Sequence, residues 1–176
     1  MFSIYSQRLT LIPLNTEQLL LLQKNRDLLT QSLGLNPSEI RMNAEIAAEL
    51  NDAIPYWISH TSQYPERYMW FTHWEIVYTG KNESIGGIGM SSWPNHNGET
   101  MIGYVIDNRH HNQGIATEAV ECLLDWMWQN PELRTVTADT PRDNYPSQRV
   151  LRKNGFEICG EDETLLHWRK RRHTGA

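Results

Sequence analysis

The sequence has few cysteines and no long hydrophobic run. Its 2 cysteines, Cys122 and Cys159, have no paired Cys/His spacing around them, which argues against a disulfide framework or a zinc site. We predict two buried thiols and no metal. The longest apolar run, Leu19 to Leu22, is far too short for a membrane span or the core of a signal peptide. These absences predict a cytoplasmic protein without a membrane partner.

The sequence also lacks an excess of positive charge. It has 16 lysines and arginines against 21 acidic residues, and its formal net charge is -5 at pH 7. A protein that coats nucleic acid needs a basic surface to neutralise phosphates, so no nucleic-acid partner is expected. The basic run from Arg169 to Arg172 is the exception, and it predicts a solvated tail.

The composition that remains is typical of a globular protein. Hydrophobic residues make up 39% of the chain and charged residues 21%, which favours an ordinary folded core over disorder. A length of 176 residues fits one domain. We therefore predict a single domain over residues 1–176 with one functional site.

The order of apolar patterns predicts an α+β fold. Asn15 and Gln18 form a capping box at the start of the first helix, and Pro55 should make the second helix restart. The expected elements, in chain order, are a strand at 8–14, a leucine-rich helix up to 32, helical pieces from 44 to 63, strands at 69–78, 84–90 and 100–106, a helix at 114–129, a strand at 134–138, a helix at 146–153 and a hairpin at 156–168. An antiparallel meander followed by a strand-helix-strand unit predicts a mixed sheet with helices on both faces.

The stretch from Tyr104 to Ala119 predicts an anion site. It passes from an apolar strand through a polar loop into an amphipathic helix. The first amides of a helix lack partners and carry partial positive charge, and Gly114 has no Cβ to hold a ligand away. A diphosphate would fit this position. The alternative is that Gly114 only eases the turn from strand to helix.

A second compact segment runs from Asn144 to Phe156. Asn144 or Tyr145 caps a short helix, Pro146 suits its first turn, and Gly155 supplies a left-handed stop. Together with the stretch around Gly114, this segment resembles the GNAT superfamily of N-acetyltransferases, within the RimJ/RimL-like branch of ribosomal-protein N-terminal acetyltransferases. The residues that carry the resemblance are Gly103, Tyr104, Gly114, Ala116, Glu118, Ala119, Asn144, Ser147, Val150, Leu151, Lys153, Gly155 and Phe156.

The resemblance implies a mostly antiparallel sheet whose central parallel strands splay apart to admit acetyl-CoA. It implies a cofactor-binding core at about 84–160 and acceptor-side helices at about 15–63. The backbone from His111 to Ala116 would hold the diphosphate, and the strand from Met101 to Val105 would pair with the pantetheine arm. The residues expected to bind the cofactor are Met101, Gly103, Val105, His111, Asn112, Gln113, Gly114, Ile115, Ala116, Asn144 and Ser147.

Three residues are candidates for the chemistry. A tyrosine that serves as the acid in many relatives would fall at Leu151, which cannot donate a proton, so Ser147 is the first candidate to assist the leaving thiolate and Tyr145 the second. Glu99 could act as a base, directly or through water. The alternatives are an ordinary first-turn serine, an aromatic that staples the helix, and a solvated glutamate at a strand end.

The predicted function is transfer of an acetyl group from acetyl-CoA to a primary amine by direct attack in a ternary complex. The acceptor would be a protein N-terminal α-amine, an amino acid or another small amine, and the sequence leaves a homodimer open. The four tryptophans Trp57, Trp70, Trp74 and Trp93 would wall the acceptor pocket or fill the core. The alternative function is a non-catalytic module that binds or senses acyl-CoA with the same fold.

Overall fold

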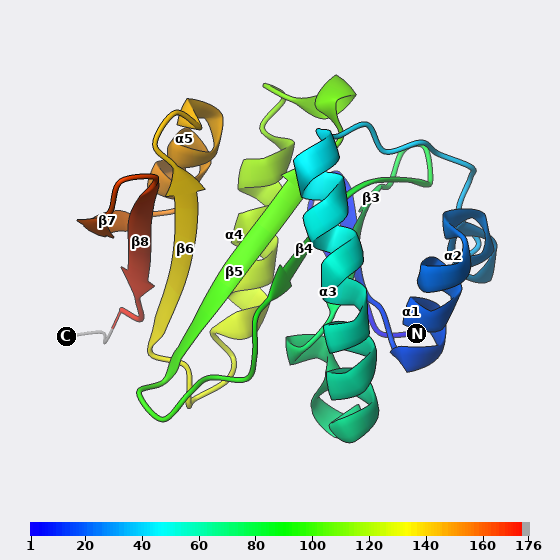
Figure 1. Cartoon of the computed structure of the whole chain (residues 1–176), viewed down its shortest axis with the longest axis horizontal. Coiled ribbons are helices and arrows are strands. Elements are labelled where there is room, and N and C mark those ends of the chain that lie inside the picture. Colours follow the sequence, from blue (N-terminus) through cyan, green and yellow to red (C-terminus); the bar gives the residue numbers. More distant parts are fainter. Residues whose placement is uncertain (174–176) are drawn as a thin grey trace.

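The computed structural model describes residues 1–173, which form one mixed sheet with helices on both faces (Figure 1). The strand order is β1-β2-β3-β4-β5-β6-β8-β7, and neighbouring strands are antiparallel except for the pair β5 and β6. The strands are β1 (Ile4–Tyr5), β2 (Leu9–Pro13), β3 (His73–Tyr78), β4 (Glu83–Met90), β5 (Glu99–Ile106), β6 (Thr135–Pro141), β7 (Glu157–Glu161) and β8 (Leu165–Arg171). This arrangement confirms the predicted fold class.

The helices divide between the two faces of the sheet. In Figure 1, α3 crosses the front of the sheet, α4 lies behind it, and α1 and α2 stand beside α3. The helical segments are α1 (Thr16–Lys24), α2 (Arg26–Ser32), α3 (Ala44–Gln63), the turn η1 (Pro65–Trp70), the turn η2 (Asn108–His110), α4 (Ile115–Met127) and α5 (Tyr145–Lys153). No helix within residues 1–173 is long and apolar enough to cross a membrane.

The main hydrophobic core holds α4 against the sheet. Ile115, Ala119, Leu123 and Met127 of α4 are buried in one cluster with side chains of β2 to β6. These are the apolar positions that helical spacing predicts, and their burial fixes where the helix begins. The N-terminus of α4 therefore has a defined position relative to β5.

The α3 face of the central strands is short of side chains. Gly87 and Gly89 alternate along β4, and the strand register places Gly89 beside Gly103 of β5. Because side chains on a strand alternate between faces, these three glycines face α3, whereas Ile88 and Ile102 face α4. A cavity can therefore form on the α3 face.

Two predictions about the helices were wrong. The leucine-rich region is divided at Asn25, whose extended backbone ends α1 and whose side chain accepts a hydrogen bond from the Asp27 amide to cap α2. Conversely, α3 continues through Pro55 as one helix. Pro55 is exposed, so the carbonyl that loses its partner can be hydrated, while Ile54 and Thr61 are buried and hold the helix on both sides. The capping box of Asn15 is confirmed.

Two predictions about the C-terminal region were also wrong. The basic run is not a solvated tail, because β8 extends to Arg171 and pairs with β6. Lys170 Nζ donates to the Asn154 carbonyl at 2.6 Å, and Arg172 Nε donates to the Leu133 carbonyl at 2.8 Å. Cys159 is exposed rather than buried, since it lies where the register of β7 shifts, and Cys122 is half-buried.

A buried carboxylate links the sheet to the α1 and α2 layer. Glu75 of β3 is fully buried, and its Oε2 lies 2.6 Å from Arg26 Nη2 of α2. Ser84 also hydrogen-bonds this oxygen, and a register shift in the pairing of β3 and β4 brings Ser84 to the same face. Burial alone would raise the pKa of Glu75, but Arg26, His73 and Ser84 outweigh it and lower the pKa to about 2.

Replacement of this carboxylate should destabilise the fold. We expect Glu75→Gln to lower the free energy of unfolding by about 3 kcal/mol at pH 7, because Arg26 loses its buried partner. The pKa of Glu75 is lowered to about 2, so its contribution is fully present above the unfolded value of about 4.3 and is lost as the pH falls toward 2. Urea unfolding between pH 2 and 7 measures this difference. The exposed Glu157→Gln is the control, and an equal effect of both variants would contradict the assignment.

Candidate functional site

The two parallel strands at the centre of the sheet part along their length. Backbone pairing between β5 and β6 is confined to Glu99 with Thr135, Thr100 with Val136, and Met101 with Thr137. Beyond Met101 the strands diverge, as Figure 1 shows. The edge of β5 from residue 102 to 106 thus faces an opening instead of a neighbouring strand, and its backbone groups are available to an extended ligand.

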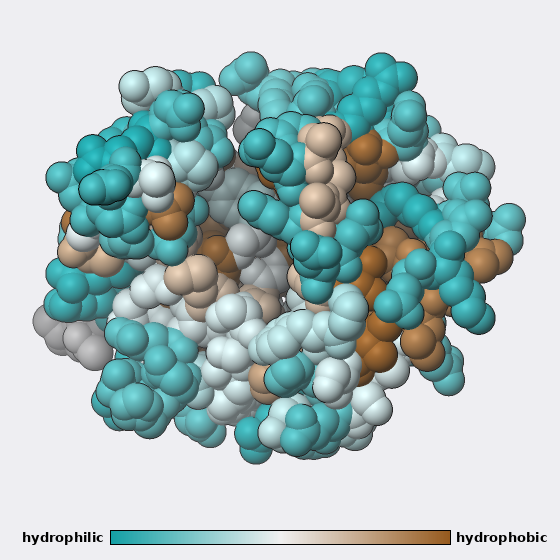
Figure 2. Space-filling model, viewed as in Figure 1, coloured by the Kyte–Doolittle hydropathy of each residue, from teal (hydrophilic) through white to brown (hydrophobic). Residues whose placement is uncertain are grey.

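Two cavities meet at this opening. A cavity of about 480 Å³ lies between β5 and the N-termini of α4 and α5, and a larger one of about 760 Å³ lies between the sheet and α3. In Figure 2 the surface is hollowed between α3 and the β6 side of the molecule. The residues that line both cavities are Asn43, Ile46, Tyr104, Val105, Asn144 and Ser147.

The N-terminus of α4 opens into the smaller cavity. Gly114 precedes the helix in a left-handed conformation, with φ at +74°, and no side chain caps the helix. The first backbone hydrogen bond of α4 is donated by Glu118 to the Gly114 carbonyl at 3.1 Å. The amides of residues 115–117 therefore have no partner within the helix and can bind an anion.

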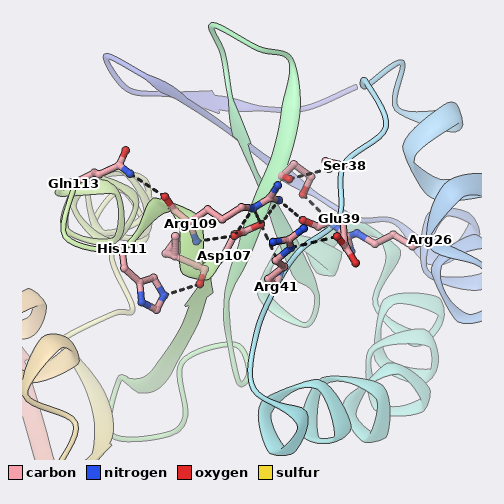
Figure 3. A network of polar contacts seen from close by, with 10 residues as sticks. Arg26, Ser38, Glu39, Arg41, Asp107, Arg109, His111 and Gln113 are labelled. Carbon is pink, nitrogen blue, oxygen red and sulfur yellow. Dashed lines mark hydrogen bonds and ion pairs between the residues drawn. The ribbon is translucent and has the colours of Figure 1, made fainter.

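A buried aspartate pins the loop before α4 (Figure 3). Asp107 is fully buried and accepts hydrogen bonds from the Arg109 amide at 2.8 Å and the Arg41 amide at 3.3 Å. Burial alone would raise the pKa of Asp107, but the hydrogen bonds from Arg109 and Arg41 outweigh it and lower the pKa to about 2. Arg109 also donates to the carbonyl of Glu39. The loop between β5 and α4 is therefore attached by hydrogen bonds to the segment that leads into α3.

Two predicted loop residues shape the loop through their own side chains. His111 Nε2 lies 2.9 Å from the Ile106 carbonyl, so Nε2 carries the hydrogen in this contact. Gln113 Nε2 donates to the Arg109 carbonyl at 3.0 Å. Asn112 has φ at +59°, a left-handed conformation that asparagine tolerates better than most residues. His111 and Asn112 line the smaller cavity, whereas Gln113 does not.

A pair of hydroxyl groups lies where the cavities meet. The Tyr104 hydroxyl of β5 is 2.8 Å from Ser147 Oγ, in the first turn of α5. The Asn144 side chain caps that turn by accepting from the Ser147 amide at 3.2 Å. Burial raises the pKa of Tyr104 to about 12, although the hydrogen bond with Ser147 acts in the opposite direction. Tyr104 therefore remains protonated at neutral pH.

Tyr104 is not among the functional residues predicted from the sequence. It is one of the residues that carry the family resemblance, and a partly buried tyrosine needs a hydrogen-bond partner. The need for a partner could have pointed to Tyr104. However, the partner, Ser147, is 43 positions away in the sequence and could not be identified without the fold. Leu151 is fully buried one turn after Ser147.

The structure brings most of the predicted residues together, but not all. Met101, Gly103 and Val105 of β5 line the larger cavity, while Gly114, Ile115 and Ala116 line the smaller one. Among the candidates for the chemistry, Ser147 borders both cavities, whereas Glu99 and Tyr145 border neither. Glu99 lies at the paired end of β5, and the Tyr145 residue is 63% exposed.

The larger cavity has acidic and aromatic walls. Glu45 and Glu49 reach it from α3, and Asp139 and Asp143 border its β6 side. Of the four tryptophans considered from the sequence, Trp57 lines it, whereas the other three belong to the main core or pack against it. Within residues 1–173, no three His, Cys, Asp or Glu side chains are grouped closely enough to hold a metal ion.

This arrangement agrees with the result of a family comparison. The acetyltransferase (GNAT) domain family matches residues 8–157. The chain therefore belongs to the GNAT acetyltransferase family, as its sequence motifs indicated. Members of this family take the acyl group from acetyl-CoA, which confirms the expected class of enzyme and of cofactor at the level of the family.

Individual relatives give the same result. The chain is 32% identical over 98 residues to the uncharacterized N-acetyltransferase YjdG of Bacillus subtilis, covering 56% of this chain and 58% of that protein. It is 34% identical over 80 residues to a ribosomal-protein-serine acetyltransferase of Escherichia coli, covering 46% and 45%. The chain thus matches about half the length of these curated relatives.

A solved structure supports the fold over nearly the whole chain. RimJ of Mycobacterium smegmatis, solved with a coenzyme A disulfide, superposes with a TM-score of 0.63 at 21% identity, covering 97% of this chain and 87% of that one. At this identity the likeness supports the fold alone. The overall fold is therefore one that this chain has in common with a GNAT structure.

A charge at the helix N-terminus should abolish cofactor binding. We expect Gly114→Asp to weaken acetyl-CoA binding at least 100-fold, because a carboxylate would face the diphosphate. Only Arg8 lies near the added Cβ, at 3.6 Å, so the fold should persist with a cost of about 1 kcal/mol for the left-handed backbone. Gly114→Asn is the matched control, since it has the same shape and no charge. Calorimetric titration measures both variants, and unchanged binding to Gly114→Asp would remove this loop from the site.

Proposed function

We propose that this chain transfers the acetyl group of acetyl-CoA to the α-amino group of a protein or peptide, by direct attack in a ternary complex. One observation carries the proposal: two cavities meet at Tyr104 and Ser147, where β5 and β6 part. Such a geometry lets a donor and an acceptor occupy separate cavities and meet at one point. Family membership supports the reaction type.

The residues around the smaller cavity fit a coenzyme A thioester. The free amides of residues 115–117 and the uncovered Gly114 suit a diphosphate. The edge of β5 from Gly103 to Val105 lacks a β6 partner and can hydrogen-bond an extended amide-containing arm. Asn144 borders the opening from the α5 side. When bound, acetyl-CoA supplies an acetyl group already activated as a thioester.

Ser147 is the candidate proton donor for the leaving sulfur. Because the pKa of Tyr104 is raised to about 12, its hydroxyl can donate to Ser147 Oγ at 2.8 Å. The hydroxyl hydrogen of Ser147 is then free to point into the opening. As the amine nitrogen bonds to the thioester carbon and the C–S bond breaks, this hydrogen can be donated to the thiolate.

An α-amino group is the favoured acceptor. Deprotonating an amine with a pKa near 8 costs about 1 kcal/mol at pH 7, whereas a lysine near 10.4 costs about 4 to 5 kcal/mol. Glu45, Glu49 and Asp139 give the larger cavity an acidic wall that attracts an ammonium group. The E. coli relative is named a ribosomal-protein-serine acetyltransferase, which also supports a protein N-terminus. A small free amine is the second candidate.

An acceptor panel tests this function. Acetyl-CoA at 100 times its Kd should stabilise the fold by about 2.7 kcal/mol in thermal unfolding. Release of free thiol should follow with peptides that carry a free α-amine and should be absent with the same peptides blocked at the N-terminus. Transfer to polyamines or free amino acids instead would replace the protein acceptor with a small amine. Tight binding without transfer to any amine would identify a non-catalytic acyl-CoA sensor.

The hydroxyl pair should act as one unit. We expect Ser147→Ala to lower kcat about 100-fold, because general-acid assistance is lost, and Tyr104→Phe to lower it about 10-fold. The double variant should be no slower than Ser147→Ala, since Tyr104 acts through Ser147. Tyr145→Phe, which alters the exposed tyrosine of the same helix, is the matched control and should keep its rate. Additive losses in the double variant would show that the two hydroxyls act separately.

A further inference from the structure

A histidine on the acceptor side of the sheet has no role in the function described so far. His73 begins β3, its side chain is 9% exposed, and it lines the larger cavity. The register places His73 beside Gly89 and Gly89 beside Gly103. These three residues form a row across β3, β4 and β5, and two of them have no side chain. The imidazole therefore faces the part of β5 that has no β6 partner, and the residues between them in this row are glycines.

Gly87 allows the imidazole to lie over β4. A Cβ built on Gly87 would lie 1.8 Å from Cε1 of His73, so the ring occupies the position of the missing side chain. The backbone of Gly87 is not in the left-handed region, which means that its conformation does not require glycine. The close approach of the His73 ring to Gly87 is what requires glycine at this position. His73 and Gly87 together let the imidazole reach from β3 over β4 toward β5. Neighbouring strands in a sheet are about 4.8 Å apart.

A buried carboxylate holds the imidazole from behind. His73 Nε2 lies 3.2 Å from Glu75 Oε1, while the other carboxylate oxygen is engaged by Arg26 and Ser84. Apart from the His73 ring, Oε1 is a fully buried oxygen without a hydrogen-bond partner among the described residues. A carboxylate in this position orients an imidazole.

The charged side chains that face His73 or border its cavity are carboxylates. Glu75 faces it on β3, Glu45 and Glu49 border the same cavity from α3, and Asp139 borders it from β6. Arg26 of α2 reaches Glu75 rather than the cavity. Within residues 1–173, neither a lysine nor an arginine lines this cavity. A cationic acceptor is therefore attracted, and a proton taken from it can be held.

We propose that His73 is the proton acceptor for the attacking amine and that Glu75 is its positioning residue. This inference rests on the proposed function. As the amine nitrogen bonds to the thioester carbonyl carbon, its proton passes to a neutral imidazole nitrogen of His73, directly or through one water. The C–S bond breaks, its electron pair leaves with the sulfur, and the thiolate takes a proton from Ser147. The net charge is balanced, because His73 gains one proton while Ser147 loses one. The proton on His73 then returns to solvent, and Ser147 Oγ regains a proton from solvent.

The test compares pH profiles of single variants. With a peptide acceptor, His73→Gln should lower kcat/KM about 100-fold at pH 7 while the Kd for acetyl-CoA changes less than twofold. The loss should shrink as the pH rises, because bases in the solvent then accept the proton that the imidazole otherwise takes from the attacking nitrogen. His96→Gln, in the exposed loop before β5, is the matched control and should behave like the wild type.

Two further variants separate catalysis from structure. Gly87→Ala should displace the imidazole and reproduce the loss seen in His73→Gln, with unchanged acetyl-CoA binding. Glu75→Gln, measured at a temperature where it is folded, should move the acidic limb of the kcat/KM profile to lower pH, because the imidazolium loses its buried counter-charge. A merely structural role of Glu75 would reduce the amplitude of that profile without moving it.

The outcomes distinguish this inference from the function on which it rests. If the wild type acetylates the peptide and His73→Gln retains the same rate and pH profile, the role of His73 is overturned and the proposed function stands. A pH-independent loss in His73→Gln, accompanied by weaker acetyl-CoA binding, also overturns it in favour of a packing role. If the wild type transfers to no acceptor, both proposals fail together.

Discussion

The site depends on the end of backbone pairing between β5 and β6 beyond Met101. Buried backbone groups need partners, and a strand that loses its neighbour inside a sheet leaves a row of donors and acceptors for a ligand. The divergence also creates the opening where the two cavities meet and where Ser147 reaches Tyr104. Without it, the amides at the start of α4 would bind an anion that has no path to the acceptor side.

The two faces of the sheet differ in how they are filled. On the α4 side, large apolar side chains fill the space and fix the helix that carries the anion site. On the α3 side, Gly87, Gly89 and Gly103 leave a floor without side chains, and the cavity forms there. The same strands supply both faces, so the alternation of glycine with isoleucine along β4 determines which side is packed and which side is open.

Local sequence signals predicted most helices and strands, but they could not predict which distant segments pair or pack together. The capping box of Asn15 and the apolar spacing of α4 could be derived from neighbouring residues. The continuity of α3 through Pro55 could not, because burial by distant segments decides it. The splay was expected only from the family resemblance, since periodicity identifies strands without their partners. For the same reason Tyr104 was overlooked, and the position of Glu99 outside both cavities could not be foreseen.

Two buried carboxylates attach the acceptor-side layer to the sheet in addition to its apolar packing. The apolar cluster under α1 to α3 has only Leu14, Leu19 and Leu29 fully buried, whereas two buried carboxylates anchor the same layer. Glu75 holds α2 through Arg26, and Asp107 holds the segment before α3 through the Arg41 amide. Both carboxylates have a pKa lowered to about 2. Both therefore stay ionised across the neutral range, so the contacts of Glu75 with Arg26 and of Asp107 with the Arg41 amide persist there.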